Sequence, residues 1–165
     1  MNLLHKIFKI NPSQQETNIF APISGTIHNI KKVPDEVFSK KIIGDGIAIE
    51  PSGNKIVAPV QGIIGTIFKT MHAFSIVTKN KIEIFVHFGI DTILLKGKGF
   101  QKIAQENQKV NVGDTIIKYD LDFLTKKAKS IITPIIISNV KHNKIIKKYE
   151  GQAIEGKTII MKVTK

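Results

Sequence analysis

Two histidines, His72 and His87, have the setting in this chain that best suits chemistry. His87 lies within the almost wholly apolar run "IEIFVHFGIDT" at 82–92, and His72 opens "HAFSI" fifteen residues upstream. An imidazole titrates near pH 6.5, so at neutral pH it can serve as a base, a nucleophile or a metal ligand. The alternative interpretation is a histidine whose polar atoms are simply satisfied inside a core.

Three chemistries use two facing imidazoles. A zinc site usually needs a third protein ligand, and the other histidines, His5, His28 and His142, show no HExxH spacing. Acid–base catalysis on a small substrate is the second, but the chain shows no nucleophile motif such as GxSxG. Covalent transfer needs one imidazole as nucleophile and the other to stabilise charge. The stretches "GKGF" and "GDG" lack the frame of a nucleotide phosphate loop, so we do not expect ATP as a donor.

A hairpin is the element that would bring the two histidines together. The strand-like runs "TMHAFSIVT" and "IEIFVHF" flank Lys79-Asn80, and asparagine tolerates the left-handed conformation of a tight turn. A two-residue loop at this pair predicts that His72 lies directly opposite His87 on one face of the sheet. Their Cβ atoms would then be about 4.5–5.5 Å apart.

Alternation along the second strand indicates which face carries the site. Ile84, Val86 and Phe88 form a fully apolar set that belongs in a core, which leaves Phe85 and His87 on the opposite, more polar face together with Glu83. This assignment argues against a core histidine at position 87.

The pattern of the rest of the chain predicts short strands. From Ile19 onward, runs rich in Ile, Val and Phe are separated by Gly, Pro, Asn or Asp. These runs are "IFAPISGTIHNI", "DGIAIEP", "KIVAPVQGIIGTIF", "AFSIVTKNKIEIFVHFG", "GDTIIKYD", "IITPIIISN" and "KTIIMKVTK". Such spacing predicts an all-β antiparallel sandwich or barrel. The weak echo between the Ala-Pro turns at 21–27 and 58–64 resembles barrel–sandwich hybrid folds. Short helical turns are predicted at "GFQKIAQEN" and "LDFLTKKAKS".

The first 18 residues form a different unit. Leu3, Leu4, Ile7, Phe8 and Ile10 follow helical spacing, with lysines between them, and a polar linker follows. We therefore divide the chain into a tail and linker at 1–18 and one domain at 19–165. The tail either orders weakly on an anionic membrane surface or is a frayed terminus.

Composition sets limits on location and partners. The chain has 165 residues, 42% of them hydrophobic, and no cysteine, which fits a reducing compartment. No secretory signal or membrane-spanning run is present, so we expect a cytoplasmic protein that is peripheral at the inner membrane through its tail. All 25 basic residues are lysine, and without arginine's bidentate fork the net charge of +12 does not indicate nucleic-acid binding.

The residues around the histidines carry a specific resemblance. "VHFGIDT" preceded by "NKIEIF", with "HAFSI" upstream, resembles the glucose-type enzyme IIA of the bacterial phosphoenolpyruvate:sugar phosphotransferase system. The similarity spans residues 19–165 and includes "VPDEVFSKKIIGDGIAIEPSGNKIVAPV" and "KGFQKIAQENQKVNVGDTI". It implies an all-β phosphotransferase component that carries phosphate as phosphohistidine for sugar uptake.

The resemblance also implies roles for individual residues. His87 corresponds to the phosphorylated histidine, His72 to a companion that contacts the phosphoryl group, and Thr70 to a threonine that hydrogen-bonds this companion. The donor would be phosphorylated HPr, and the acceptor a cysteine of a IIB domain on another polypeptide. No cofactor is required, although zinc bridging His72 and His87 is a further expectation when a partner supplies a third ligand.

An apolar docking patch is implied as well. Its members, and the acidic residue beside them, are expected to contact partners: Phe38, Ile42, Ile43, Phe68, Phe85 and Asp91. Core packing is the alternative role for each phenylalanine. Lys81 departs from the family, which usually has glycine at this position, and Asn80 is expected to take over the turn.

Two other functions fit the predicted fold. A zinc-dependent hydrolase of a related hybrid fold would need further metal ligands. A biotinyl- or lipoyl-like carrier would need a modified lysine at a hairpin tip, and Lys79 and Lys81 lack the usual neighbours of such a lysine.

Overall fold

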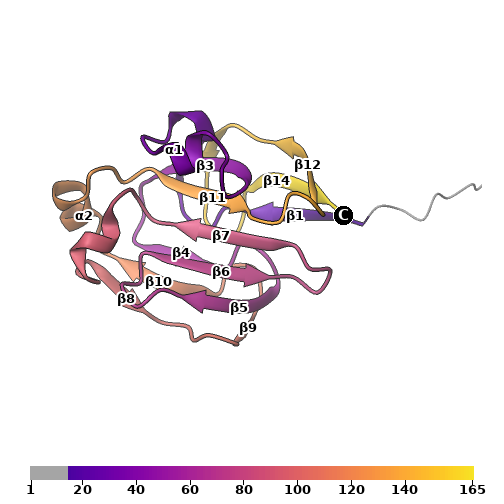
Figure 1. Ribbon diagram of the computed structural model, residues 1–165. Helices are drawn as coiled ribbons and strands as arrows, with labels where there is room; N and C mark the ends of the chain where they lie inside the picture. The colour runs from indigo at the N-terminus through magenta and orange to yellow at the C-terminus, as the bar shows by residue number, and fades with distance from the viewer. Residues whose placement is uncertain (1–14) are drawn as a thin grey trace, which may run out of the picture.

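The computed structural model describes residues 15–165, which form three antiparallel sheets (Figure 1). The largest has eight strands in the order β13 (Gly151–Ala153), β2 (Gly25–Asn29), β3 (Asp45–Pro51), β11 (Thr133–Ile137), β7 (Glu83–His87), β6 (Ala73–Val77), β5 (Gly62–Ile67) and β9 (Lys109–Val110). The two smaller sheets are β1 (Glu16–Phe20), β14 (Ile159–Thr164), β12 (Lys144–Lys148), and β4 (Lys55–Val57), β10 (Thr115–Tyr119), β8 (Phe100–Lys102). The predicted all-β antiparallel fold is confirmed.

The core lies between the large sheet and the two small ones. Its fully buried side chains include Ile76 and Ile84 from the large sheet, Met161 from β14 and Ile117 from β10. Because strands alternate their side chains, each strand of β5–β7 buries one face and leaves the other free to carry a site.

Within residues 15–165, helical structure is confined to four short segments: the 3₁₀ turns η1 (Ile30–Lys32) and η2 (Thr92–Leu95), and the helices α1 (Glu36–Ser39) and α2 (Leu121–Lys127). Helix α2 confirms one of the two predicted helical stretches. The other, residues 99–107, is wrong: Gly99 is left-handed (φ +86°), and Phe100 begins β8 with its ring 5.3 Å from that of Phe88. Burying this aromatic ring in the core favours the strand over a helical turn.

Helix α1 was not foreseen. Asp35 caps it by accepting a hydrogen bond from the backbone N–H of Val37 at 2.8 Å. One turn is too short to show a helical period, so only this capping signal could have indicated it.

The β6–β7 hairpin is formed as predicted, but with a different register. Its loop has three residues, Lys79–Lys81, and pairs Ala73 rather than His72 with His87. The backbone N–H of Lys81 bonds the carbonyl of Thr78 at 3.0 Å, and Lys81 has φ +67°. A left-handed residue at the end of a turn adds one residue to the loop, which explains the shift. The prediction that Asn80 takes this role is therefore wrong.

The N-terminal boundary also differs from the prediction. Strand β1 starts at Glu16, so part of the predicted linker pairs with β14, from Glu16 opposite Thr164 to Asn18 opposite Lys162. The amphipathic stretch at 3–10 lies outside the described residues. Within residues 15–165, no helix combines the length and apolar content that crossing a membrane requires.

We predict that Lys81→Gly stabilises the protein. A side chain at φ +67° is strained, and removing it should raise the free energy of unfolding by up to about 1 kcal/mol. Urea unfolding at pH 7 measures the change. Lys79→Gly in the same loop is the control, because Lys79 does not have a positive φ, and glycine there should leave stability equal or lower. A loss of stability in Lys81→Gly would contradict the assignment of strain.

Candidate active site

The two histidines meet at one end of the β6–β7 hairpin. Their ring centroids are 4.8 Å apart, and the ring planes are nearly perpendicular at 82°. His87 ends β7 on the outer face, as the alternation predicted, while Ile84, Val86 and Phe88 are buried. The predicted encounter is thus confirmed, although not through direct pairing across the strands.

His72 reaches the site by a turn that precedes β6. Met71 is left-handed (φ +57°), and the carbonyl of His72 accepts the backbone N–H of Phe88 at 2.7 Å. In a regular strand with the observed register, His72 would point into the core with Phe74. The left-handed turn ends the strand at Ala73, so the ring of His72 lies against that of His87 instead.

The ring of His87 is fixed through Nδ1. This atom lies 2.8 Å from the carbonyl oxygen of Gly89, which can only accept a hydrogen bond, so Nδ1 carries the proton. In the neutral ring, Nε2 is then the unprotonated nitrogen and holds a free lone pair. Sequence reasoning missed this role of Gly89, although "VHFG" contains it.

Gly89 is required by its surroundings as well as by its conformation. It has φ +63°, and a Cβ there would lie 2.4 Å from the carbonyl oxygen of Ser130. Its N–H donates to the hydroxyl of the buried Thr133 at 3.3 Å. The turn that presents the carbonyl to His87 is therefore packed tightly against the start of β11.

His72 is fixed by a side-chain contact. Its Nδ1 lies 2.6 Å from the hydroxyl of Thr70, so the predicted partnership of these residues is present in the structure. Because each imidazole has its Nδ1 engaged, Nε2 is the nitrogen that both rings have left for chemistry.

Burial holds both rings in the neutral form. Desolvation, and then the neighbouring His87, lower the pKa of His72 to about 4. Burial also lowers the pKa of His87, opposed by its hydrogen bond to Gly89 and by the carboxylates of Asp35 and Asp91. At neutral pH, the lone pair of Nε2 is therefore available.

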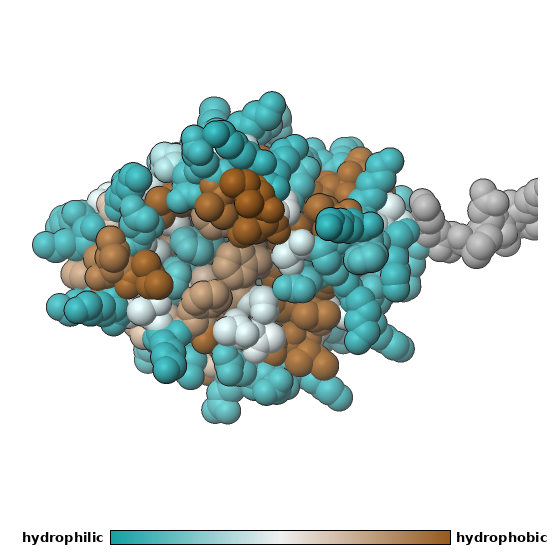
Figure 2. Space-filling model, viewed as in Figure 1, coloured by the Kyte–Doolittle hydropathy of each residue, from teal (hydrophilic) through white to brown (hydrophobic). Residues whose placement is uncertain are grey.

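Aromatic rings surround the pair. Phe38 lies 5.1 Å from His87, Phe68 lies 5.4 Å from His72, and Phe85 lies 6.0 Å from both His87 and Phe68, all between ring centroids. Figure 2 shows hydrophobic side chains gathered on this face, with hydrophilic ones around them. This arrangement buries His72 and leaves His87 half-buried at the surface.

The predicted docking residues differ in how far their side chains are exposed to solvent. Ile42, Ile43 and Phe68 are 66%, 37% and 39% exposed, which excludes simple core packing for Phe68. Phe85 is half-buried, whereas Phe38 is only 5% exposed and packs in a small core beneath α1. Phe38 thus packs beside the ring of His87 and offers little surface of its own.

Acidic groups border the site. Asp91 is exposed and left-handed (φ +57°), and its carboxylate lies 3.7 Å from the ammonium of Lys129. Asp35, the cap of α1, also acts on His87 electrostatically and was not predicted from the sequence. No sequence signal could have identified Asp35, because its proximity to His87 depends on how α1 packs.

Comparison with known proteins gives consistent matches. Residues 17–143 match the family described as phosphoenolpyruvate-dependent sugar phosphotransferase system, EIIA 1. The PTS system glucose-specific EIIA component of Haemophilus influenzae is 52% identical over the whole of both chains, and that of Buchnera aphidicola from Acyrthosiphon pisum is 58% identical over 90% of this chain and 92% of the relative.

A fused relative and a solved structure agree with this. The PTS system glucose-specific EIICBA component of Staphylococcus carnosus is 39% identical, covering 87% of this chain and 21% of that protein. The solved structure of glucose permease IIA from Mycoplasma capricolum superposes with a TM-score of 0.85 at 38% identity, covering 90% of this chain and 96% of that one.

We predict that acid destabilises the fold through His72. Its folded pKa of about 4 lies below the ordinary value of 6.5, so between these values the unfolded chain binds a proton that the folded chain does not. The contribution of His72 to the free energy of unfolding is therefore complete above pH 6.5. It decreases as the pH falls toward 4, by up to about 3 kcal/mol.

Urea unfolding at pH 7, 5.5 and 4.5 measures this loss. His72→Gln should flatten the dependence, whereas the exposed His142→Gln should retain it. Identical slopes in the His72 variant and the wild type would rule out this residue as the source.

Proposed function

Because the chain belongs to the EIIA 1 family of the phosphoenolpyruvate-dependent sugar phosphotransferase system, we propose that His87 is the residue on which it carries phosphate. The chain is a phosphocarrier of this system and serves sugar uptake with EIIB domains. The observation that carries the proposal is the hydrogen bond from Nδ1 of His87 to the carbonyl of Gly89, which leaves Nε2 as the nucleophile.

At each step of phosphoryl transfer, phosphorus forms a bond to the accepting atom and its bond to the donor atom breaks. The lone pair of Nε2 attacks the phosphorus of phospho-HPr, the Nε2–P bond forms, and the bond from phosphorus to the donor nitrogen breaks. In the second step, a cysteine thiolate of the IIB domain attacks the same phosphorus, and the Nε2–P bond breaks. The 165 residues contain no cysteine, so this acceptor lies outside them.

His72 stabilises charge in this proposal. If the hydroxyl of Thr70 donates to Nδ1 of His72, the proton of the neutral ring lies on Nε2, where it can donate to a phosphoryl oxygen on His87. A ring that stays neutral in the free protein also makes no strong ion pair with the phosphoryl group, which favours its onward transfer.

The carboxylates of Asp35 and Asp91 favour release as well. Both act electrostatically on His87, and they raise the energy of a dianionic phosphoryl group there. Asp91, together with exposed Ile42, Ile43 and Phe68, borders the surface on which we place HPr and the IIB domain in turn.

Zinc and membrane contact remain parts of the proposal. Within residues 15–165 no three His, Cys, Asp or Glu side chains cluster to hold a metal, so zinc on His72 and His87 would need a third ligand from a partner.

The amphipathic stretch at 3–10 would hold the carrier weakly at an anionic membrane. The family assignment favours neither a zinc hydrolase nor a lipoyl-like carrier.

We predict that His87→Ala takes up no phosphate from phosphoenolpyruvate, enzyme I and HPr. The substitution removes the only nitrogen that the site presents as a nucleophile with a fixed tautomer. Intact mass shows the single phosphoryl group, and its lability in acid identifies a phosphoramidate. His142→Ala is the control and should accept phosphate normally. Phosphate on any other residue of the wild type would refute the assignment.

We predict that His72→Gln still accepts phosphate but delivers it to a IIB cysteine about 100-fold more slowly, which is typical for loss of one donor to a developing charge. Rapid-quench measurement of both half-reactions separates acceptance from delivery. Thr70→Val should show a smaller defect in the same step, because the ring keeps its Nε2. Onward transfer at the wild-type rate in His72→Gln would exclude the role.

A further inference from the structure

The outer face of the large sheet continues well beyond the histidines. Along β7 the face carries His87, Phe85 and Glu83, and on β6 it carries Ser75 opposite Phe85 and Val77 opposite Glu83. Val77 in turn pairs with Ile63 of β5. Four residues of strand place this second region about 13 Å from His87.

Small residues keep the face flat between the two regions. Gly65 and Ser75 are neighbours, since the hydroxyl of Ser75 accepts the backbone N–H of Thr66 at 3.1 Å. A Cβ on Gly65 would lie 2.5 Å from that hydroxyl oxygen. Nothing therefore rises from the sheet here to separate the apolar surface at Phe85 from that at Val77.

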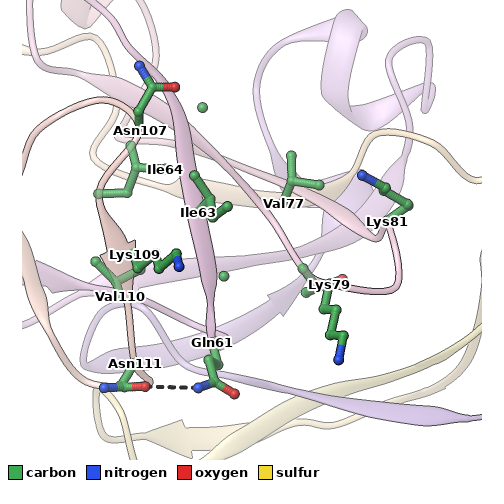
Figure 3. Close-up of a pocket in the computed structure, with 13 residues that line it drawn as sticks. Gln61, Ile63, Ile64, Val77, Lys79, Lys81, Asn107, Lys109, Val110 and Asn111 are labelled. Carbon is green, nitrogen blue, oxygen red and sulfur yellow. Dashed lines mark hydrogen bonds between the residues drawn. The ribbon is translucent and has the colours of Figure 1, made fainter.

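A groove of about 720 Å³ forms the far end of this face. Its apolar surface includes Ile63, which is 45% exposed, and Val77. In Figure 3, Lys109 lies beside Ile63, and Lys79 and Lys81 lie at the hairpin beyond Val77. Lys109 lies on the same face as Ile63 because the two residues are paired across β5 and β9.

The groove is strongly positive. Lys79, Lys81 and Lys109 are exposed, and none has a salt-bridge partner among residues 15–165. The acidic side chain on the adjoining part of the face is the half-buried Glu83. An apolar surface with three lysines at its border fits a partner surface that is apolar at its centre and acidic at its edge.

We propose that the docking face extends from His87 to this groove, and that the phosphotransfer partners carry acidic side chains opposite Lys79, Lys81 and Lys109. The proposal rests on the function proposed above. A standard interface covers about 800 Å² per partner, roughly 30 Å across, so a protein that covers His87 at one side of its interface reaches the lysines at the other.

A lipid surface is the other anionic occupant, and the geometry disfavours it. The groove and His87 share one face of one sheet, so a membrane seated on the groove would cover the histidine that must exchange partners. A protein that docks on the histidine covers both regions in a single encounter.

The test compares the full chain with the triple variant Lys79→Glu/Lys81→Glu/Lys109→Glu in both half-reactions, from phospho-HPr and to the IIB domain of the same organism. We expect the second-order rate constant of at least one half-reaction to fall about tenfold or more at low ionic strength. The loss should shrink toward twofold at 0.5 M salt, where the Debye length is only about 4 Å. The rate at saturating partner should stay unchanged, since the lysines do not touch the reacting atoms.

Controls separate the outcomes. Lys118→Glu, at an exposed position of β10 in another sheet, should leave both rate constants unchanged, and Lys109→Glu alone should show a partial loss. Unchanged rates in the triple variant, or an equal loss in Lys118→Glu, would overturn this inference alone. Loss of binding to phosphatidylglycerol vesicles with both rates intact would assign the groove to lipid and also overturn it. A wild-type chain that accepts no phosphate would overturn the proposed function as well.

Discussion

The hydrogen bond between Nδ1 of His87 and the carbonyl of Gly89 is the constraint on which the site depends. It selects the tautomer, orients the ring and leaves Nε2 with the free lone pair. The bond exists because Gly89 adopts a left-handed conformation that packs against Ser130 and Thr133 at the start of β11. The chemistry at the end of β7 thus relies on a neighbouring strand that contributes no reactive group.

Burial then sets the charge state of the pair. Both imidazoles lose hydration against Phe38, Phe68 and Phe85. For His87 this burial outweighs the carboxylates of Asp35 and Asp91, which favour the charged form, so the pKa of each ring is lowered. Two neutral rings can lie 4.8 Å apart without repulsion. Two of these aromatic side chains, Phe68 and Phe85, also belong to the accessible apolar surface beside the histidines.

The two faces of the large sheet have different roles. The inner face packs into the core, where Ile76, Ile84 and Val86 are almost fully buried, and this packing holds the strands of the outer face in place. The outer face is flat because Gly65 and Ser75 are small, and it links the histidines at one end to the lysine-bordered groove at the other. A carrier that meets more than one partner needs such an open surface rather than an enclosed cleft.

The sequence by itself determined most of the strands, although not, for instance, β8 or β12, and also the alternation that directs His87 outward and the family to which "VHFGIDT" points. These features depend on local pattern, which one chain displays fully. Only the tertiary structure decided the register and the way His72 reaches His87, because the left-handed residues Met71 and Lys81 shift and end the pairing without any glycine to announce them. The burial of Phe38 and the influence of Asp35 on His87 likewise came from the packing of α1, a contact between segments some fifty residues apart that no local pattern encodes.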